Sequence, residues 1–142
     1  MFEKKNITYI LTALEAIEKI FLYAEDFTDG DDFFQANDQM NFNATQTLRL
    51  VIGEETRKIH EDLLAQQPQI PWKLISSLRN RIAHDYRSVD PHISFDIIQN
   101  YLPELKVSLI AMIQLIEYEK GFLERIISSP HYRHLKYLLS NE

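Results

Sequence analysis

The sequence predicts an all-α protein, a bundle of four main helices followed by a short C-terminal helix. Apolar residues recur at helical intervals through most of the chain, and no segment alternates apolar and polar residues as a half-buried strand does. The 142 residues are 45% hydrophobic and include only 3 Gly and 5 Pro, a composition that suits one globular domain. We therefore expect a single domain over residues 1–142, large enough to bury about 68–70% of its unfolded surface.

The first helix is expected over about residues 5–25, where apolar residues from Ile7 to Phe21 follow the i, i+3, i+4 rule. The next segment, 25–38, carries six acidic residues and no basic one. It has no metal-loop spacing, so we interpret it as a solvated connection with one short helical turn near Phe33 and Phe34.

A second helix is expected over about residues 40–66, and Gly53 lies inside it. Gly costs about 1 kcal/mol relative to Ala in a helix, and the simplest reason for it is the close approach of a neighbouring helix. The apolar stripe of this helix is predicted to comprise Ala44, Leu48, Val51, Ile52, Ile59 and Leu63.

Three further helices are expected between the prolines that follow. One begins at Pro71 and ends near 84–86, one covers about 92–101, and a long one runs from Pro103 to about 127. Leu105, Leu109, Met112, Ile113 and Ile116 form the stripe of the long helix. Ser128, Ser129 and Pro130 end it, and a last short helix is expected over 131–139.

Several classes of protein are excluded by composition. There are no cysteines, so disulfides, thiolate nucleophiles and iron–sulfur clusters are ruled out. The net charge of −6 disfavours sequence-independent coating of duplex DNA. The N-terminus lacks a signal-peptide pattern, and the most apolar run, 107–116, is too short to cross a bilayer. We expect a cytoplasmic protein without a membrane partner.

One segment, 71–89, differs in charge from the rest of the chain. It has four basic residues against Asp85 alone, a net charge of +3, which leaves −9 for the remainder. A basic segment on an acidic protein is a plausible binding place for RNA phosphates, and the candidate phosphate contacts in it are Lys73, Arg81 and Arg87.

Arg79 and His84 in this segment could together cleave RNA without a metal or cofactor. His84 could take the proton of a 2′-hydroxyl, and Arg79 could stabilise the charge that develops on the phosphate. Asn80 could orient Arg79 or the phosphate, and Tyr86 offers a hydroxyl. Basic residues at a helix C-terminus also satisfy the helix dipole, so spacing alone leaves a structural role open.

Geometry restricts how these groups could meet. Arg79 and Tyr86 share a helix face, but His84 lies about 140° from Arg79 on a regular helix. Either the helix breaks near residue 83, or two copies related by a two-fold axis build the site. A second Arg–His pair at this spacing, Arg87 and His92, contains Pro91 and lacks the tyrosine, so it serves as an internal comparison.

The octapeptide Arg79-Asn80-Arg81-Ile82-Ala83-His84-Asp85-Tyr86 resembles the Arg-x4-His-x-Tyr motif of HEPN-domain ribonucleases, specifically the HepT-like toxins. Neighbouring residues are similar in order and spacing, and the resemblance covers about residues 5–120. These further matches are Ile52-Gly53-Glu54, Ile70-Pro71-Trp72, Val89-Asp90 and Leu102-Pro103-Glu104-Leu105.

The resemblance implies an antiparallel HEPN bundle, a homodimer and an endoribonuclease site where two motif copies meet. It implies Arg79 and His84 as catalytic residues, with Asn80 and Tyr86 supporting them. It also implies a toxin–antitoxin pair, in which an MntA-like nucleotidyltransferase antitoxin transfers AMP to Tyr86. The alternative is a non-enzymatic HEPN dimer that serves as binding partner of a nucleotidyltransferase.

The chain departs from the family pattern in two places. Glu55 stands where the family often has a small residue, and the C-terminal extension 121–142 lies beyond the resemblance. The extension is either a packing helix with a solvated basic face or a surface for the partner or RNA. Two residues near the motif also have two interpretations each. Glu54 either pairs with Arg79 or is simply exposed, and Trp72 either packs in the core or an interface or stacks on bases.

Overall fold

The structure, a computed structural model, describes residues 2–141 and confirms the all-α fold. Within this range the only β pairing is one isolated parallel bridge, between Phe2 and Ile116. The helices are α1 (Lys5–Ala24), α2 (Gly30–Gln35), α3 (Met40–Lys58), α4 (Glu61–Leu64), α5 (Trp72–His84), α6 (Pro91–Asn100), α7 (Leu102–Ile113) and α8 (Phe122–Ile127). Short 3₁₀ turns cover Ala36–Gln39, Tyr86–Ser88, Pro130–Tyr132 and Lys136–Asn141. The helices expected over 5–25, 71–86 and 92–101 correspond to α1, α5 and α6.

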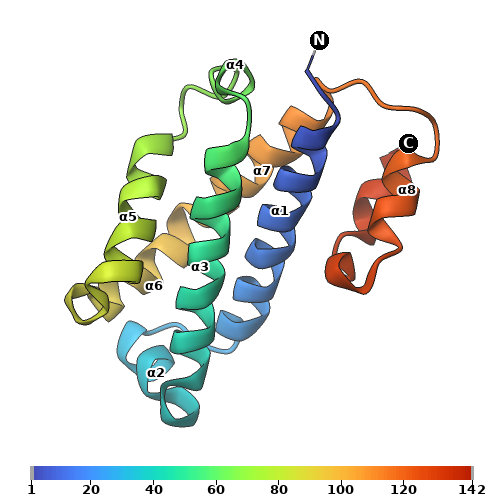
Figure 1. The fold of residues 1–142 in the computed structure, drawn as a ribbon. Helices are drawn as coiled ribbons and strands as arrows, with labels where there is room; N and C mark the ends of the chain where they lie inside the picture. The colour runs from blue at the N-terminus through green and yellow to red at the C-terminus, as the bar shows by residue number, and fades with distance from the viewer. Residues whose placement is uncertain (1, 142) are drawn as a thin grey trace.

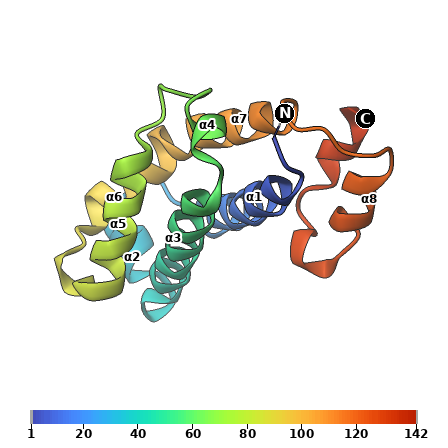
Figure 2. The same cartoon turned by 45° about the horizontal axis from the view of Figure 1, so that its top comes forward.

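The helices form two layers (Figures 1 and 2). α5, α3 and α1 lie side by side in one layer, and α6 and α7 cross behind them. The segment 122–141, which we call the C-terminal segment, lies beyond α1, on the side of the molecule opposite α5. No helix within residues 2–141 combines the length and apolarity needed to span a bilayer.

α1 is the centre of the hydrophobic core. It packs against α3 and α7, and the 3₁₀ turn Pro130–Tyr132 contacts it as well. Because neighbours surround it, apolar residues on more than one face of α1 are removed from water, which is the main stabilising term of such a bundle. Its fully buried apolar residues are Ile7, Ile10, Leu11, Ala13, Leu14, Ile17 and Ile20.

The second helix is shorter than the sequence predicted: α3 ends at Lys58 instead of 66. Ile59 and His60 adopt extended backbone, and α4 begins at Glu61. The side chain of Asn6 on α1 accepts a hydrogen bond from the backbone N–H of His60 (2.9 Å). His60 in turn caps α4, because its Nδ1 accepts from the N–H of Asp62. At the junction of the two helices, the backbone N–H groups of His60 and Asp62 therefore both have hydrogen-bond partners.

The buried face of α3 also differs from the predicted stripe. Leu48 and Val51 are only half-buried, whereas Thr45, Gln46, Arg49 and Thr56 are buried polar residues. Arg49 Nη2 donates to the carbonyl oxygen of Ser94 on α6, and burial lowers the pKa of this guanidinium to about 10. α3 lies between α1 and α5, so residues outside a single apolar stripe are also covered.

The long helix predicted over 103–127 is broken, because α7 ends at Ile113 and α8 starts only at Phe122. N-terminal residues hold the connection between them. Phe2 forms its backbone bridge with Ile116, and Lys4 Nζ lies 2.8 Å from Glu119 Oε1. Gly121, at φ +87°, provides the left-handed turn into α8, a conformation that suits glycine.

The C-terminal segment docks on α1, which supports a packing role for it. Two 3₁₀ turns replace the helix expected over 131–139, and Leu135 and Leu138 are buried. Tyr132 and Thr12 share a hydrogen bond (3.0 Å), and Tyr137 donates to Glu18 (2.6 Å). The buried carboxylate of Glu15 accepts from the backbone N–H of His134 and contacts its ring Nδ1.

The Asn6 contact yields a test of the fold. Asn6 is 2% exposed, and its Nδ2 donates to the carbonyl of Glu3 (2.9 Å) while Oδ1 accepts from His60. Asn6→Ala leaves both backbone groups without these partners, so we expect the free energy of unfolding to fall by about 1–3 kcal/mol in urea titrations. Thr8→Ala, at an exposed position on the same helix, should change it by less than about 0.5 kcal/mol. Equal effects of the two substitutions would contradict this role of Asn6.

Candidate active site

α5 carries the Arg-x4-His segment, and its beginning is fixed by Trp72. The indole Nε1–H donates to the carbonyl oxygens of Leu64 (3.1 Å) and Gln67 (3.2 Å). The ring is half-buried and packs against the core, so Trp72 is a core residue rather than a platform for bases. Along the rest of α5, Ile82 is the only buried residue.

α3 and α5 approach each other closely at Gly53. A Cβ at Gly53 would lie 2.5 Å from Arg79 Cβ and 2.8 Å from its Cγ. These distances are shorter than any ordinary van der Waals contact, so only glycine fits while α5 stays in place. The prediction that Gly53 allows a neighbouring helix to approach is therefore confirmed.

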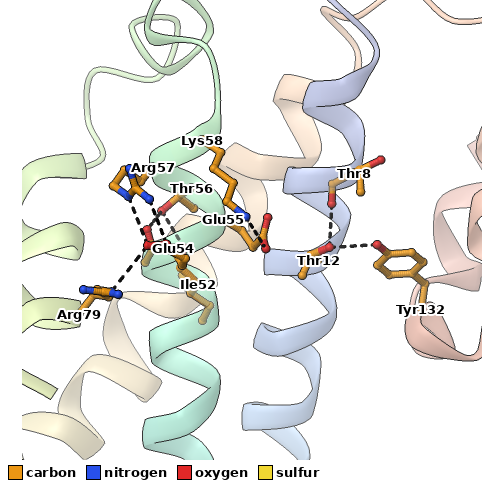
Figure 3. A network of polar contacts seen from close by, with 11 residues as sticks. Thr8, Thr12, Ile52, Glu54, Glu55, Thr56, Arg57, Lys58, Arg79 and Tyr132 are labelled. Carbon is orange, nitrogen blue, oxygen red and sulfur yellow. Dashed lines mark hydrogen bonds and ion pairs between the residues drawn. The ribbon is translucent and has the colours of Figure 1, made fainter. Parts of the chain in front are cut away.

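The Arg79 side chain passes over Gly53 toward Glu54, the next residue on α3 (Figure 3). Arg79 Nε lies 3.7 Å from Glu54 Oε1, close enough for an ion pair but too far for a hydrogen bond. This Nε is buried and has no hydrogen-bond partner among residues 2–141, while Nη1 donates to Asn80 Oδ1 (3.1 Å). Glu54 thus pairs with Arg79 and is not simply an exposed carboxylate.

Glu54 is held ionised beside Arg79 by a third residue. Arg57, one turn along α3, donates two hydrogen bonds to the carboxylate, Nε to Oε1 (3.2 Å) and Nη2 to Oε2 (3.0 Å). The Arg57 hydrogen bonds, and secondarily the positive charges of Arg57, Arg79 and Lys58, hold the pKa of Glu54 below its usual value. Arg79 therefore faces a permanent negative charge at neutral pH, which fixes the direction of its side chain.

His84 lies on the opposite, exposed face of α5. The helix continues without a break through His84, so this residue stays about 140° around the axis from Arg79. The structure therefore does not bring Arg79 and His84 together within one chain. Seven residues of α5 are exposed: Lys73, Leu74, Ser77, Asn80, Arg81, Ala83 and His84.

Tyr86 follows α5 in the 3₁₀ turn Tyr86–Ser88, after Asp85 has left helical geometry at φ −147° and ψ 58°. Its hydroxyl donates a hydrogen bond to Asn43 Oδ1 in the first turns of α3. Its ring packs edge-on against Phe42, with 6.3 Å between the ring centres. The side chain remains partly accessible, with 41% exposure of the residue, and burial of the remainder raises the pKa of the phenol.

Arg79 and Tyr86 are thus attached to one face of α3 at separate positions. Their partners Glu54 and Asn43 are 11 residues apart, which on a helix is about 16 Å along nearly the same face. Asn43 could not be identified from the sequence, because it is 43 residues from Tyr86 and belongs to no motif.

The remaining candidates are placed around this site. Lys73, Arg81 and Arg87 are exposed, as a phosphate-binding role requires. His92 pairs with Asp31 of the acidic connection (3.1 Å). Among residues 2–141, no three His, Asp or Glu side chains converge in a way that could hold a metal ion.

Comparison with known proteins decides the family. A family profile described as "Ribonuclease HepT-like" matches residues 13–112, which run from α1 to the end of α7. The chain belongs to the HepT-like ribonuclease family. The C-terminal segment of this HepT-like chain lies outside the matched residues.

Two relatives illustrate the similarity of this HepT-like chain to known proteins. A protein of Methanocaldococcus jannaschii named "Putative RNase" is 31% identical over 101 residues, 70% of this chain and 81% of its own length. The "Probable ribonuclease HepT" of Thermococcus cleftensis is 28% identical over 104 residues, 73% of this chain and 92% of its own length. No solved structure is significantly similar to the chain.

The contact at Gly53 can be tested by Gly53→Ala. At an open helix position this change stabilises by about 1 kcal/mol, but here the new methyl would displace Arg79 and α5. We expect a net loss of about 1–3 kcal/mol in the free energy of unfolding, the usual cost of overpacking, measured in urea. Thr47→Ala, at an exposed position on the same helix, is the control. A more stable Gly53→Ala protein would show that α5 does not press on Gly53.

Proposed function

We propose that this protein is a toxin that acts as a metal-independent endoribonuclease, with Arg79 and His84 as its catalytic residues. The observation that carries the proposal is the Arg79 side chain, which is fixed between Gly53 and Glu54 while 33% of it stays exposed and open to a substrate. Membership of the HepT-like ribonuclease family and the exposed imidazole of His84 support the same activity.

In the proposed reaction, His84 accepts the proton of an RNA 2′-hydroxyl and the 2′-oxygen attacks the adjacent phosphorus. The bond from phosphorus to the 5′-oxygen breaks, and that oxygen leaves with its electron pair and takes up a proton. Arg79 donates to the phosphate oxygens, where negative charge develops, and Asn80 holds the Arg79 Nη1. Lys73, Arg81 and Arg87 bind neighbouring phosphates. Because the internal hydroxyl is the nucleophile, no metal-bound water is needed.

Two copies of the chain complete the site in this proposal. Arg79 faces α3 and His84 faces away from it, so a two-fold axis over the exposed face of α5 lets His84 of one copy meet Arg79 of the other. Leu74, on this face and 67% exposed, offers apolar surface that a second copy could cover. The proposed assembly is therefore a homodimer.

Mixed dimers test this arrangement. Arg79→Ala and His84→Ala homodimers should each lose RNA cleavage, whereas their heterodimer, purified through two different tags, keeps one intact site and about half of wild-type activity. A heterodimer of a wild-type chain with an Arg79→Ala/His84→Ala chain is the matched control. It should be inactive, because each of its two sites lacks one residue.

Different outcomes would contradict specific parts of the proposal. Half activity in the control heterodimer would place both residues of a site in one chain. Cleavage lost in EDTA and restored by Mg²⁺ would overturn the Arg–His mechanism. Wild-type protein that forms the dimer but cuts no RNA would favour the non-enzymatic HEPN dimer that serves a nucleotidyltransferase.

We further propose that an MntA-like nucleotidyltransferase antitoxin neutralises the toxin by transferring AMP to Tyr86. The partly exposed phenol supports this role, since another protein could reach it. Within one chain the Tyr86 hydroxyl binds Asn43, which lies about 16 Å along α3 from Glu54, the partner of Arg79. The attached AMP would therefore chiefly obstruct the path of RNA past His84. Its negative charge would also repel RNA phosphate.

Incubation with the cognate nucleotidyltransferase and ATP should therefore raise the mass of the chain by AMP and abolish cleavage. Tyr86→Phe removes the acceptor oxygen, so this variant should gain no mass and should go on cutting RNA in the presence of the transferase. Intact-protein and peptide mass spectrometry provide the measurement. A label on another residue, or a fully labelled chain that still cuts at the normal rate, would disprove this role of Tyr86.

A further inference from the structure

The proposed acceptor hydroxyl of Tyr86 is already engaged within the chain. It donates its hydrogen bond to Asn43 Oδ1, and the ring is supported by Phe42, which itself packs edge-on against Phe34 with 4.8 Å between the ring centres. Asn43 is exposed, so no core packing requires an amide at this position. The visible role of the Asn43 amide is therefore to accept the hydrogen bond from Tyr86.

Transfer of AMP requires the phenol to lose its proton, and this hydrogen bond holds the proton in place. The phenolic oxygen must form a bond to the α-phosphorus of ATP, while the bond to the bridging oxygen breaks and pyrophosphate leaves with the electron pair. The phenolic proton must pass to a base on the transferase. The amide oxygen of Asn43 holds that proton but is far too weak a base to accept it, and a hydrogen bond donated by the neutral phenol favours the neutral form.

We propose that Asn43 is a positioning residue that keeps the Tyr86 phenol docked on α3 and protonated, so that AMP transfer requires its release. The inference rests on the proposed function of Tyr86. It adds a site of selectivity: a transferase must bind over the first turns of α3 and replace Asn43 with its own proton acceptor. A protein that merely encounters the exposed ring edge would find an unreactive hydroxyl.

The state of the phenol can be read without any partner protein. Tyrosine labelled with ¹³C at Cζ reports ionisation by NMR, and Tyr86→Phe identifies the Tyr86 signal among the seven tyrosines. The raised pKa of Tyr86 is caused by burial, so it should fall toward the ordinary value of 10.0 in Asn43→Ala, which opens the hydroxyl to water. The loss of the acceptor acts in the same direction. The pKa should stay raised in Asn43→Asp, which keeps an acceptor. Thr47→Ala, one turn further along the exposed side of α3, should leave it unchanged, because the Thr47 hydroxyl bonds only to the main-chain carbonyl of Asn43 (3.2 Å) and not to its amide.

The rate of modification is the second measurement, made with the nucleotidyltransferase of the proposed pair and α-labelled ATP. Asn43→Ala should be modified about fivefold faster than the wild type at subsaturating toxin, the factor expected for one neutral hydrogen bond. Asn43→Asp should be modified no faster than the wild type, and Thr47→Ala at the wild-type rate. In urea, Asn43→Ala should lose no more stability than this fivefold factor represents, and Thr47→Ala should stay near the wild-type value because position 47 is exposed.

The outcomes separate this inference from the function on which it rests. A labelled wild-type Tyr86, together with unchanged pKa and unchanged rate in Asn43→Ala, would overturn the role of Asn43 alone. Slower modification of Asn43→Ala would also overturn it, because Asn43 would then present the hydroxyl rather than withhold it. A wild-type chain that takes no AMP on Tyr86 would overturn the proposed regulation and with it this inference.

Discussion

The close approach of α3 and α5 at Gly53 is the constraint on which the site depends. It places the base of the Arg79 side chain on the α3 backbone, where the guanidinium extends to Glu54. Because α5 is a regular helix, fixing Arg79 against α3 also fixes the opposite face toward solvent, and His84 is on that face. One backbone contact thus determines the direction of both proposed catalytic groups, and explains why a single chain cannot bring them together.

Much of this could be predicted from sequence, because the signals are local. The helical period of α1 is unbroken, and the glycine within α3 pointed to a neighbouring helix. What the sequence could not show were contacts between distant positions. α3 ends at Lys58 because Asn6 holds the His60 N–H, and α7 ends at Ile113 where Phe2 and Lys4 hold the chain that follows. No local pattern records such partners, so both helices were predicted too long.

α3 shows a second limit of periodicity. A helix with neighbours on two sides buries more than one stripe, and part of its covered surface is polar. Arg49 is buried without a carboxylate partner, and its Nε and Nη1 have no hydrogen-bond partner among residues 2–141. Such a group destabilises the fold, and the hydrophobic surface that α1 buries must offset it. The apolar-stripe rule places an arginine on the outside of a helix, and for this residue it was wrong.

The C-terminal segment has a consequence for the timing of folding. Its three polar contacts with α1 join positions 119 or 120 residues apart: Thr12 with Tyr132, Glu15 with His134, and Glu18 with Tyr137. During synthesis, α1 leaves the ribosome early, and its partners at 132–137 are made only after nearly all the other residues described here. Contacts of such long sequence separation form late because the loop they close is long. A nascent chain can therefore pair α1 with α3 first, but the far side of α1 stays open to water, or to chaperones, until translation has passed residue 137.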